Sequence, residues 1–526
     1  MAVVLVLLFR RLLAFLITLA ALAASRPVRV RREIRSLSEA ERKDFFWALW
    51  ETKRHDLDEG VALYGPRFKP YDYFVLQHVS AVLDPRGDQA HFTPSFMTFH
   101  RAFLMEMEAT LLDILATRNS SSSGESGGSG TGIGIGIGGI PYWDFSLDSD
   151  TGPYYLSEDE YLFSAAFLGS LDGDATEGYA VADGQVAHWP VSQYDAAAIA
   201  GLGVPPASVA YLNEVYRGSA APAPLLRSAN NTNAAGFLTR FPTPRGAPFP
   251  TMDRRGGLDY GAGSFASCAS WRQGVRDWMG WQECVENGRA PRRADNASAA
   301  FDFVSGLAWL HSQPHVKVGS WDENSSAFGA ALPCCPVDFA RVGPLAMGDF
   351  FDLATSPNDP LFLLHHANVD RLNVRWQRAA LVAAGPAILA AGGGRAWGYP
   401  ASYEAWRNAT TSRAPDFAWL GAIDGTLLDD VASSNFPFYK EDLFPSSEDE
   451  DNGATDGDDG NYDEGGGNEK GEREKKGKAG QQRQREQQQH RHQQQKKLPT
   501  SAPLTHRQIL ALTDPGIAPY TYDSFT

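Results

Sequence analysis

Histidines recur in two groups along this chain, and their spacing constrains the fold more than any other feature. The first group has three members and the second has four: His78, His91 and His100, then His311, His315, His365 and His366. Residues four apart lie on one side of a helix, so His311 and His315 can hold a single metal ion together. The pattern predicts two adjacent three-histidine sites where helices meet.

Helical signals mark four segments. The clearest start signal is a capping box at Ser38 and Glu41, after which apolar residues recur at helical spacing. Proline in the first turn favours a helix start at two of the other segments. The predicted helices cover 36–54, 93–117, a stretch just before and through 311–315, and 359–382. We therefore predict a mainly α fold in which a four-helix bundle core holds the two histidine sites, with long loops and few short strands.

Copper is one of two metals that the ligand type favours. Imidazole suits copper, zinc, iron or nickel, and a site without cysteine or carboxylate ligands favours copper or zinc. The zinc-protease helix motif needs H-E-x-x-H, in which the glutamate is the general base. Here Ser312 stands in the place of that glutamate, which argues against a protease.

Composition excludes some classes of protein. Of 526 residues, 43% are hydrophobic and 21% are charged, so the chain as a whole is globular. It has 63 acidic against 47 basic residues and a formal charge of −16. Most nucleic-acid-binding proteins need a broad basic surface, so we expect no nucleic-acid partner.

The N-terminus has the pattern of an export signal. Residues 12–24 are apolar, follow Arg10 and Arg11, and contain Ala21 and Ala23 at the spacing of a cleavage site. We predict a signal peptide over 1–25 and a secreted protein or one in the lumen of the secretory pathway, with no stable membrane span after signal removal. An uncleaved signal anchor is the alternative, because 1–9 is also apolar.

Export would permit glycans and disulfides. Five Asn-x-Ser/Thr sites are then acceptors, namely Asn119, Asn230, Asn296, Asn324 and Asn408. Export would also permit disulfides among the four cysteines, Cys268, Cys284, Cys334 and Cys335. A bond between the adjacent Cys334 and Cys335 would be strained, so we expect each to pair elsewhere, and the pairing itself stays open.

Composition also divides the chain. We predict a metal-binding domain over 31–445 that carries a flexible Gly/Ser insertion at 119–139. Residues 446–503 are low in complexity, acidic at first and then basic, and have too few apolar residues to offset the entropy of ordering. We predict a disordered insertion there, and a C-terminal segment, 504–526, that returns to the core.

The sequence around the histidines resembles the tyrosinase family of type-3 copper proteins, which includes tyrosinases, catechol oxidases and, more distantly, haemocyanins. The matching runs are YDYFVLQH ending at His78, HFTPSFMTFHRAFLMEME from His91, IPYWDFSLD from Ile140, HSQPHVKVG from His311 and SPNDPLFLLHHANVDRL from Ser356. The opening RREIRSLSEAER from Arg31 and the closing TYD at 521–523 are also typical.

The resemblance implies a ligand set. It places one copper on His78, His91 and His100, and the other on His311, His315 and His366. The family ligand stands four residues before an aspartate, here Asp370, so His365 is expected to orient or pack against the site. Asp370 and Arg371 are expected to be structural, and Phe96, Phe103, Trp143 and Phe362 to form the core around the bundle.

The resemblance also implies an activity, the oxidation of phenols by O₂ in a copper-dependent reaction that makes o-quinones, and so a pigment-forming type of chemistry. Many family members carry Asn after the first ligand of the second site and Glu a few residues before it. Here Ser312 follows that ligand, 305–310 contains no acid, and Asp302 is the nearest upstream carboxylate. We therefore expect oxidation of o-diphenols over hydroxylation of monophenols. The alternatives are a dioxygen-binding protein or a non-catalytic type-3 copper protein. The oligomeric state stays open.

Overall fold

The computed structural model is built mainly from helices, which confirms the predicted fold class. It describes residues 28–84, 88–91, 93–122, 137–148, 157, 160–194, 225–228, 231–242, 278–287, 311–322, 345–384, 438–443, 502–513 and 518–524. The predicted signal peptide and the low-complexity segment lie outside these ranges. Asp302 also lies outside them, as do four of the five glycan acceptors and three of the four cysteines. For Asn119 and Cys284 the structure describes the backbone but not the side chain.

Nine helices and two strands make up about half of the described residues. The helices are α2 (Glu39–Arg54), α3 (Leu57–Tyr64), α4 (Tyr71–Val82), α5 (Phe96–Ser122), α9 (Trp278–Asn287), α10 (Ser312–Gly319), α11 (Leu361–Ala384), α14 (Lys440–Leu443) and α17 (His506–Leu512). The strands are β1 (Arg29–Arg31) and β2 (Tyr520–Tyr522), and short 3₁₀ turns lie at Ile34–Ser36, Phe145–Asp148, Ala175–Glu177 and Ser356–Asn358. None of the described helices is both long and apolar enough to cross a bilayer.

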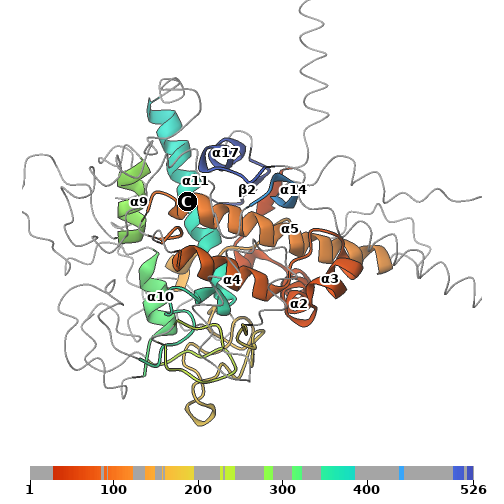
Figure 1. Ribbon diagram of the computed structural model, residues 1–526, viewed down its shortest axis with the longest axis vertical. Coiled ribbons are helices and arrows are strands. Elements are labelled where there is room, and N and C mark those ends of the chain that lie inside the picture. Colours follow the sequence, from red (N-terminus) through yellow and green to blue (C-terminus); the bar gives the residue numbers. More distant parts are fainter. Residues whose placement is uncertain are drawn as a thin grey trace, which may run out of the picture.

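Helix α5 is the central element of the fold. It packs against α2 and α11 along its length, and α14 and α17 also contact it (Figure 1). Its apolar side is fully buried, as the exposed fractions of Phe99, Phe103 and Leu111 (0%) show. The predicted core aromatic residues Phe96, Phe103, Trp143 and Phe362 are likewise 0% exposed, so their place in the core is confirmed.

The ends of α5 differ from the prediction. The helix begins at Phe96 rather than Thr93, because Thr93 and Pro94 belong to the turn before it, whose Thr93 carbonyl accepts a hydrogen bond from Phe96 N at 3.1 Å. It continues to Ser122, into the predicted Gly/Ser insertion. Serine is tolerated in a helix, whereas Gly costs about 1 kcal/mol relative to Ala, and the first glycine of that insertion is Gly124.

The capping box that the sequence predicts at the start of α2 is present. The Ser38 hydroxyl accepts a hydrogen bond from Glu41 N at 3.3 Å, and the Glu41 carboxylate accepts one from Ser38 N at 2.8 Å. These two bonds satisfy backbone donors that a helix start would leave unpaired. Helix α2 is thereby fixed against α5 and α4, the two helices that carry histidines of the first group.

The two ends of the described chain meet beside α5 and α11. Strand β1 pairs in parallel with β2, with Arg29 opposite Tyr520 and Arg31 opposite Tyr522. Between 160 and 241, the described residues form turns and isolated bridges, as the Gly- and Pro-rich composition of that region suggests. Among the described residues, the sheet has these two strands alone.

Candidate metal centre

The first histidine cluster joins two helices and the turn between them. His78 lies in α4, His91 in the turn before α5, and His100 in α5. One ligand nitrogen from each of the three lies within 4.8 Å of the others. All three side chains are buried, with at most 3% exposed. Helix α4 is not among the helices predicted from the sequence, so the position of His78 is a finding of the structure.

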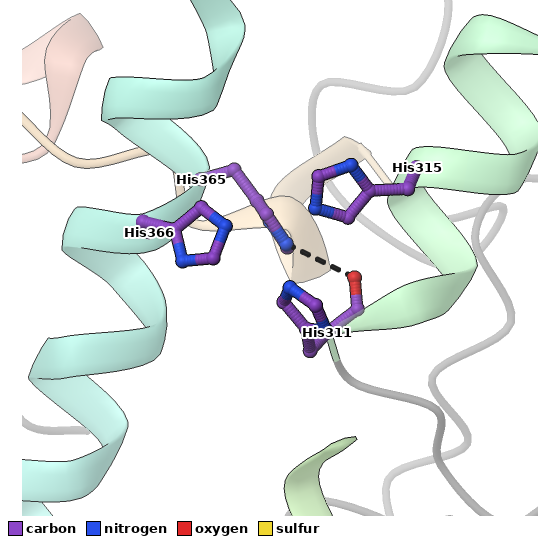
Figure 2. A group of neighbouring side chains, drawn as sticks. All are labelled: His311, His315, His365 and His366. Carbon is purple, nitrogen blue, oxygen red and sulfur yellow. Dashed lines mark hydrogen bonds between the residues drawn. The ribbon is translucent and has the colours of Figure 1, made fainter. Parts of the chain in front are cut away.

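The second cluster joins α10 and α11. His311 immediately precedes α10, and His315 lies one turn along it, as their spacing predicts. His365 and His366 are neighbours on α11, and the four rings converge in the space between the two helices (Figure 2). One nitrogen of each ring lies within 4.8 Å of the others.

The two clusters are adjacent. The ring of His100 stacks on that of His366, with centroids 4.0 Å apart and planes 9° apart. The rings of His91 and His311 have centroids 6.0 Å apart. The structure therefore brings all six predicted ligands together, and His365 with them.

Backbone carbonyls fix the orientation of three of these rings. His78 Nδ1 donates to the Ala354 carbonyl, His100 Nδ1 to that of Phe96, and His315 Nδ1 to that of Phe350, each at 2.8 Å. A carbonyl can only accept, so each Nδ1 carries the proton and each Nε2 keeps its lone pair. Those three Nε2 atoms are buried and have no hydrogen-bond partner among the described residues.

Asp88 orients the remaining ring of the first cluster, and the sequence prediction missed it. Its Oδ2 lies 3.2 Å from His91 Nδ1, and its Oδ1 accepts hydrogen bonds from the backbone N–H groups of Ala90 and His91 at 2.7 and 2.8 Å. A carboxylate three residues before a candidate ligand is a local signal that could have been found, because such pairs orient metal-binding histidines.

His365 differs from the other members of its cluster. Its Nε2 donates to the His311 carbonyl at 3.0 Å (Figure 2). Its Nδ1 therefore keeps the lone pair. Both ring nitrogens of its neighbour His366 are buried without a hydrogen-bond partner among the described residues. The His366 ring is held by packing instead, against His100 and against Phe362, whose centroid lies 4.1 Å away.

Burial favours the uncharged form of six of these histidines. It lowers the pKa of His315 to about 3, and burial together with the neighbouring histidines lowers the pKa of five others well below 6.5: His78, His100, His311, His365 and His366. Neutral imidazole is the form that binds a metal ion. Buried lone pairs without partners cost free energy unless a ligand satisfies them, so this donor set fits two copper ions.

Comparison with known proteins identifies the family. The model of the common central domain of tyrosinase matches residues 69–379, more than half of the chain. The chain belongs to the tyrosinase family. It is 25% identical over 352 residues to a tyrosinase of Streptomyces antibioticus, covering 66% of this chain and 83% of that protein. A tyrosinase of Streptomyces glaucescens is 24% identical over 358 residues, covering 66% and 82%.

Among solved structures, a mutant of polyphenol oxidase from Thermothelomyces thermophila aligns with a TM-score of 0.39 and 18% identity, covering 78% of this chain and 83% of that one. As a member of the tyrosinase family, this chain is a copper-dependent oxidoreductase with a dinuclear, type-3 copper centre. Its family acts on phenolic substrates with O₂.

Proposed function

We propose that this tyrosinase-family chain oxidises o-diphenols to o-quinones at a copper pair in which His78, His91 and His100 bind one ion and His311, His315 and His366 bind the other. The single observation that supports this most strongly is the geometry of the nitrogens. The Nε2 atoms of His78, His100 and His315 are buried without a hydrogen-bond partner among the described residues, and their Nδ1 protons are held by carbonyls. One nitrogen of each ring lies within 4.8 Å of those of the other members of its cluster.

His366 is the better candidate for the sixth ligand than His365. Its ring stacks on His100 of the other cluster, so it lies at the junction of the two clusters. The Nε2–H of His365 is already bonded to the His311 carbonyl. His365 therefore acts by holding the backbone at the start of α10, and so the position of His311.

The reaction is a two-electron oxidation. Each catechol loses two electrons and two protons, and one O₂ accepts the electrons of two catechols and becomes two molecules of water. Bound copper supplies the route for these electrons. The protein supplies the neutral imidazoles that hold the two ions, and the buried rings of Phe96, Phe350 and Phe362 that pack against them and exclude water.

The positions of the carboxylates near the two clusters support a preference for diphenols over monophenols. Hydroxylation of a monophenol needs a base near the second cluster, and 305–310 offers no acid. Among the described residues, the carboxylate that is hydrogen-bonded to a cluster histidine is Asp88, on the first cluster, and it is occupied by backbone donors and His91.

The test compares a catechol with its own monophenol on the copper-loaded full chain. 4-tert-Butylcatechol is expected to be oxidised, and 4-tert-butylphenol to react much more slowly or only after a lag. Equal rates on both would overturn the preference for diphenols. No quinone from the catechol, with two coppers bound per chain, would overturn the oxidase itself.

Matched variants test the ligand assignment. His366→Asn is expected to remove one copper and lower catechol oxidation by well over ~100-fold, more than the effect typical of a residue that only orients a ligand. His365→Gln keeps a donor for the His311 carbonyl and should retain both coppers. His188→Asn is the control, since His188 is a surface residue at φ 51°, a conformation that Asn tolerates. Loss of copper from His365→Gln but not from His366→Asn would reverse the assignment.

We also propose that the chain is exported and that 446–503 does not shield the copper site. The apolar run at 12–24 supports export, and the scarcity of apolar residues in 446–503 argues against a packed cover. Secreted protein should begin after residue 25, as N-terminal sequencing would show. Deletion of 446–503 should leave catechol oxidation unchanged, and a large rise would contradict the proposal.

A further inference from the structure

One short segment, 348–355, contacts both histidine clusters. The carbonyl of Phe350 accepts the proton of His315 Nδ1, in the second cluster. Four residues later, the carbonyl of Ala354 accepts the proton of His78 Nδ1, in the first. Both hydrogen bonds are 2.8 Å long. The position of this segment therefore sets the orientation of one imidazole in each cluster.

The segment is packed against the end of α10 without space to spare. A Cβ atom on Gly348 would lie 2.0 Å from the carbonyl oxygen of Gly319, and one on Gly319 would lie 2.0 Å from Phe351 N. Only glycine permits two backbones to approach so closely. The ring of Phe350 also stacks on His315, with centroids 4.1 Å apart. A shift of the segment would therefore move His315.

A buried ion pair holds the other side of the segment. Arg227 Nε donates to Asp349 Oδ1 at 2.8 Å, and a second guanidinium nitrogen donates to Oδ2 at 2.9 Å. The side chains are 3% and 0% exposed. The same carboxylate accepts hydrogen bonds from the backbone N–H and the hydroxyl of Thr239, at 2.8 and 3.1 Å.

The guanidinium is anchored in turn. A third nitrogen of Arg227 donates to the carbonyls of Asn233 and Ala235 at 2.8 and 2.6 Å. The ion pair thus ties the segment to residues 227 and 233–239, which lie more than 70 positions before it in the sequence. A bidentate pair of this kind fixes direction as well as distance.

Stability alone is a weak reason for this arrangement. A buried ion pair costs several kcal/mol in desolvation for each ion, and apolar replacements are often neutral or stabilising. What the pair does supply is a fixed position for Asp349, which directly precedes Phe350 and lies five residues before Ala354.

We propose that Arg227 and Asp349 are positioning residues for the copper pair, which act on both ions at once by fixing the carbonyls of Phe350 and Ala354. This rests on the proposed function, in which His78 and His315 bind different ions. Loosening the pair lets both carbonyls move, and each histidine then loses the bond that keeps its Nε2 lone pair directed at the metal.

The experiment measures copper binding by the full chain rather than catalysis. Copper stoichiometry and the dissociation constants of the two ions are determined by competition with a chelator, for the unaltered protein, Asp349→Asn and Arg227→Lys. Asp349→Asn is expected to weaken the binding of both ions, with dissociation constants that rise by roughly 10–100-fold, the range typical of changes beside a ligand. Arg227→Lys, which keeps the charge but not the bidentate geometry, should have a smaller effect on both, and it is informative even where Asp349→Asn fails to fold.

The control is Asp113→Asn, which alters another bidentate Arg–Asp pair, with Arg67. Asp113 lies 13 residues beyond His100 on α5, about 20 Å away at 1.5 Å per residue. It should leave both dissociation constants unchanged. Variants of Arg227 and Asp349 that lose stability but keep both affinities, or that weaken only one ion, would overturn the proposal. Failure of the unaltered chain to bind copper would instead overturn the proposed function.

Discussion

Two neighbouring layers of the α5–α11 interface differ in whether their buried polar groups have hydrogen-bond partners. In one layer His100 stacks on His366, and their Nε2 atoms have no hydrogen-bond partner among the described residues. In the next, Arg101 Nε donates to Asp370 Oδ1 at 2.6 Å. Arg101 directly follows His100, and Asp370 lies one turn beyond His366. The same two helices thus present unpaired lone pairs in one layer and paired charges in the other.

The charged layer joins four parts of the chain at one carboxylate. Asp370 Oδ2 accepts hydrogen bonds from Arg31 in β1, at 3.2 Å, and from the hydroxyls of Tyr520 and Tyr522 in β2, both at 2.7 Å. Burial alone would raise the pKa of Asp370, but Arg101 and Arg31 lower it below its ordinary value. Paired polar groups mark a structural junction, whereas unpaired buried lone pairs mark a ligand site.

The largest effect on stability is expected in the charged layer. Asp370→Asn keeps the shape but removes the charge that two buried arginines share, so the free energy of unfolding should fall by about 3–5 kcal/mol. Unfolding of the metal-free chain by guanidinium chloride measures this change in free energy. Because the folded pKa is lowered, the stabilisation is full above pH 3.8 and is lost as the pH falls through the folded pKa.

Tyr520→Phe is the matched control for that change. It removes one hydrogen bond to the same carboxylate and should cost about 1.5–3 kcal/mol, the range for a hydrogen bond to a charged group. An Asp370→Asn variant that is no less stable than Tyr520→Phe would contradict the interpretation of Asp370 as the junction of the charged layer.

A second substitution tests the histidine layer through Asp88, which orients His91. Asp88→Asn keeps Oδ1 for the backbone donors but places an amide NH₂ opposite His91 Nδ1. His91 would then have to accept there, which moves its proton to Nε2 and removes the lone pair that faces the cluster. Copper affinity of the first site should fall by about 10–100-fold, while the unfolding free energy changes little.

Chelator competition measures this affinity, and the second copper serves as an internal control because Asp88 contacts only the first cluster among the described histidines. An equal loss of affinity for both copper ions would show that Asp88 acts through the overall fold rather than through His91.

The smallest effect is expected at a buried carboxyl that belongs to neither layer. Glu106 accepts hydrogen bonds from Tyr73 and Gln77 at 3.1 and 2.9 Å. Burial and then the nearby Asp442 raise its pKa to about 7. The folded protein therefore keeps a proton that the unfolded chain releases above pH 4.5, and stability falls as the pH rises from 4.5 to about 7.

Glu106→Gln removes that titration. Relative to the unaltered chain, the variant should gain roughly 1–3 kcal/mol of stability between pH 5 and pH 8, at 1.36 kcal/mol per pKa unit. Unfolding at the two pH values measures the difference. Glu39→Gln, at an exposed i,i+4 pair with Lys43, should show no such gain, and a pH-independent difference for Glu106→Gln would contradict the raised pKa.

Much of the fold and the site was accessible from local patterns. Helical periodicity and the capping box predicted α2, and the four-residue spacing placed His311 and His315 on one face. The long helix of His365 and His366 was predicted to within two residues at each end. The helix that carries His78 was not predicted, because it is buried on nearly all sides and so lacks an amphipathic pattern.

The sequence by itself determined which residues can bind metal and which helix faces carry them, because periodicity depends only on neighbours along the chain. Only the tertiary structure decided what holds them in place. The carbonyls of Ala354 and Phe350 that orient His78 and His315, and the pairing of β1 with β2 around Asp370, join residues 35 to 491 positions apart. Such partners follow from the path of the folded chain, which no local pattern specifies.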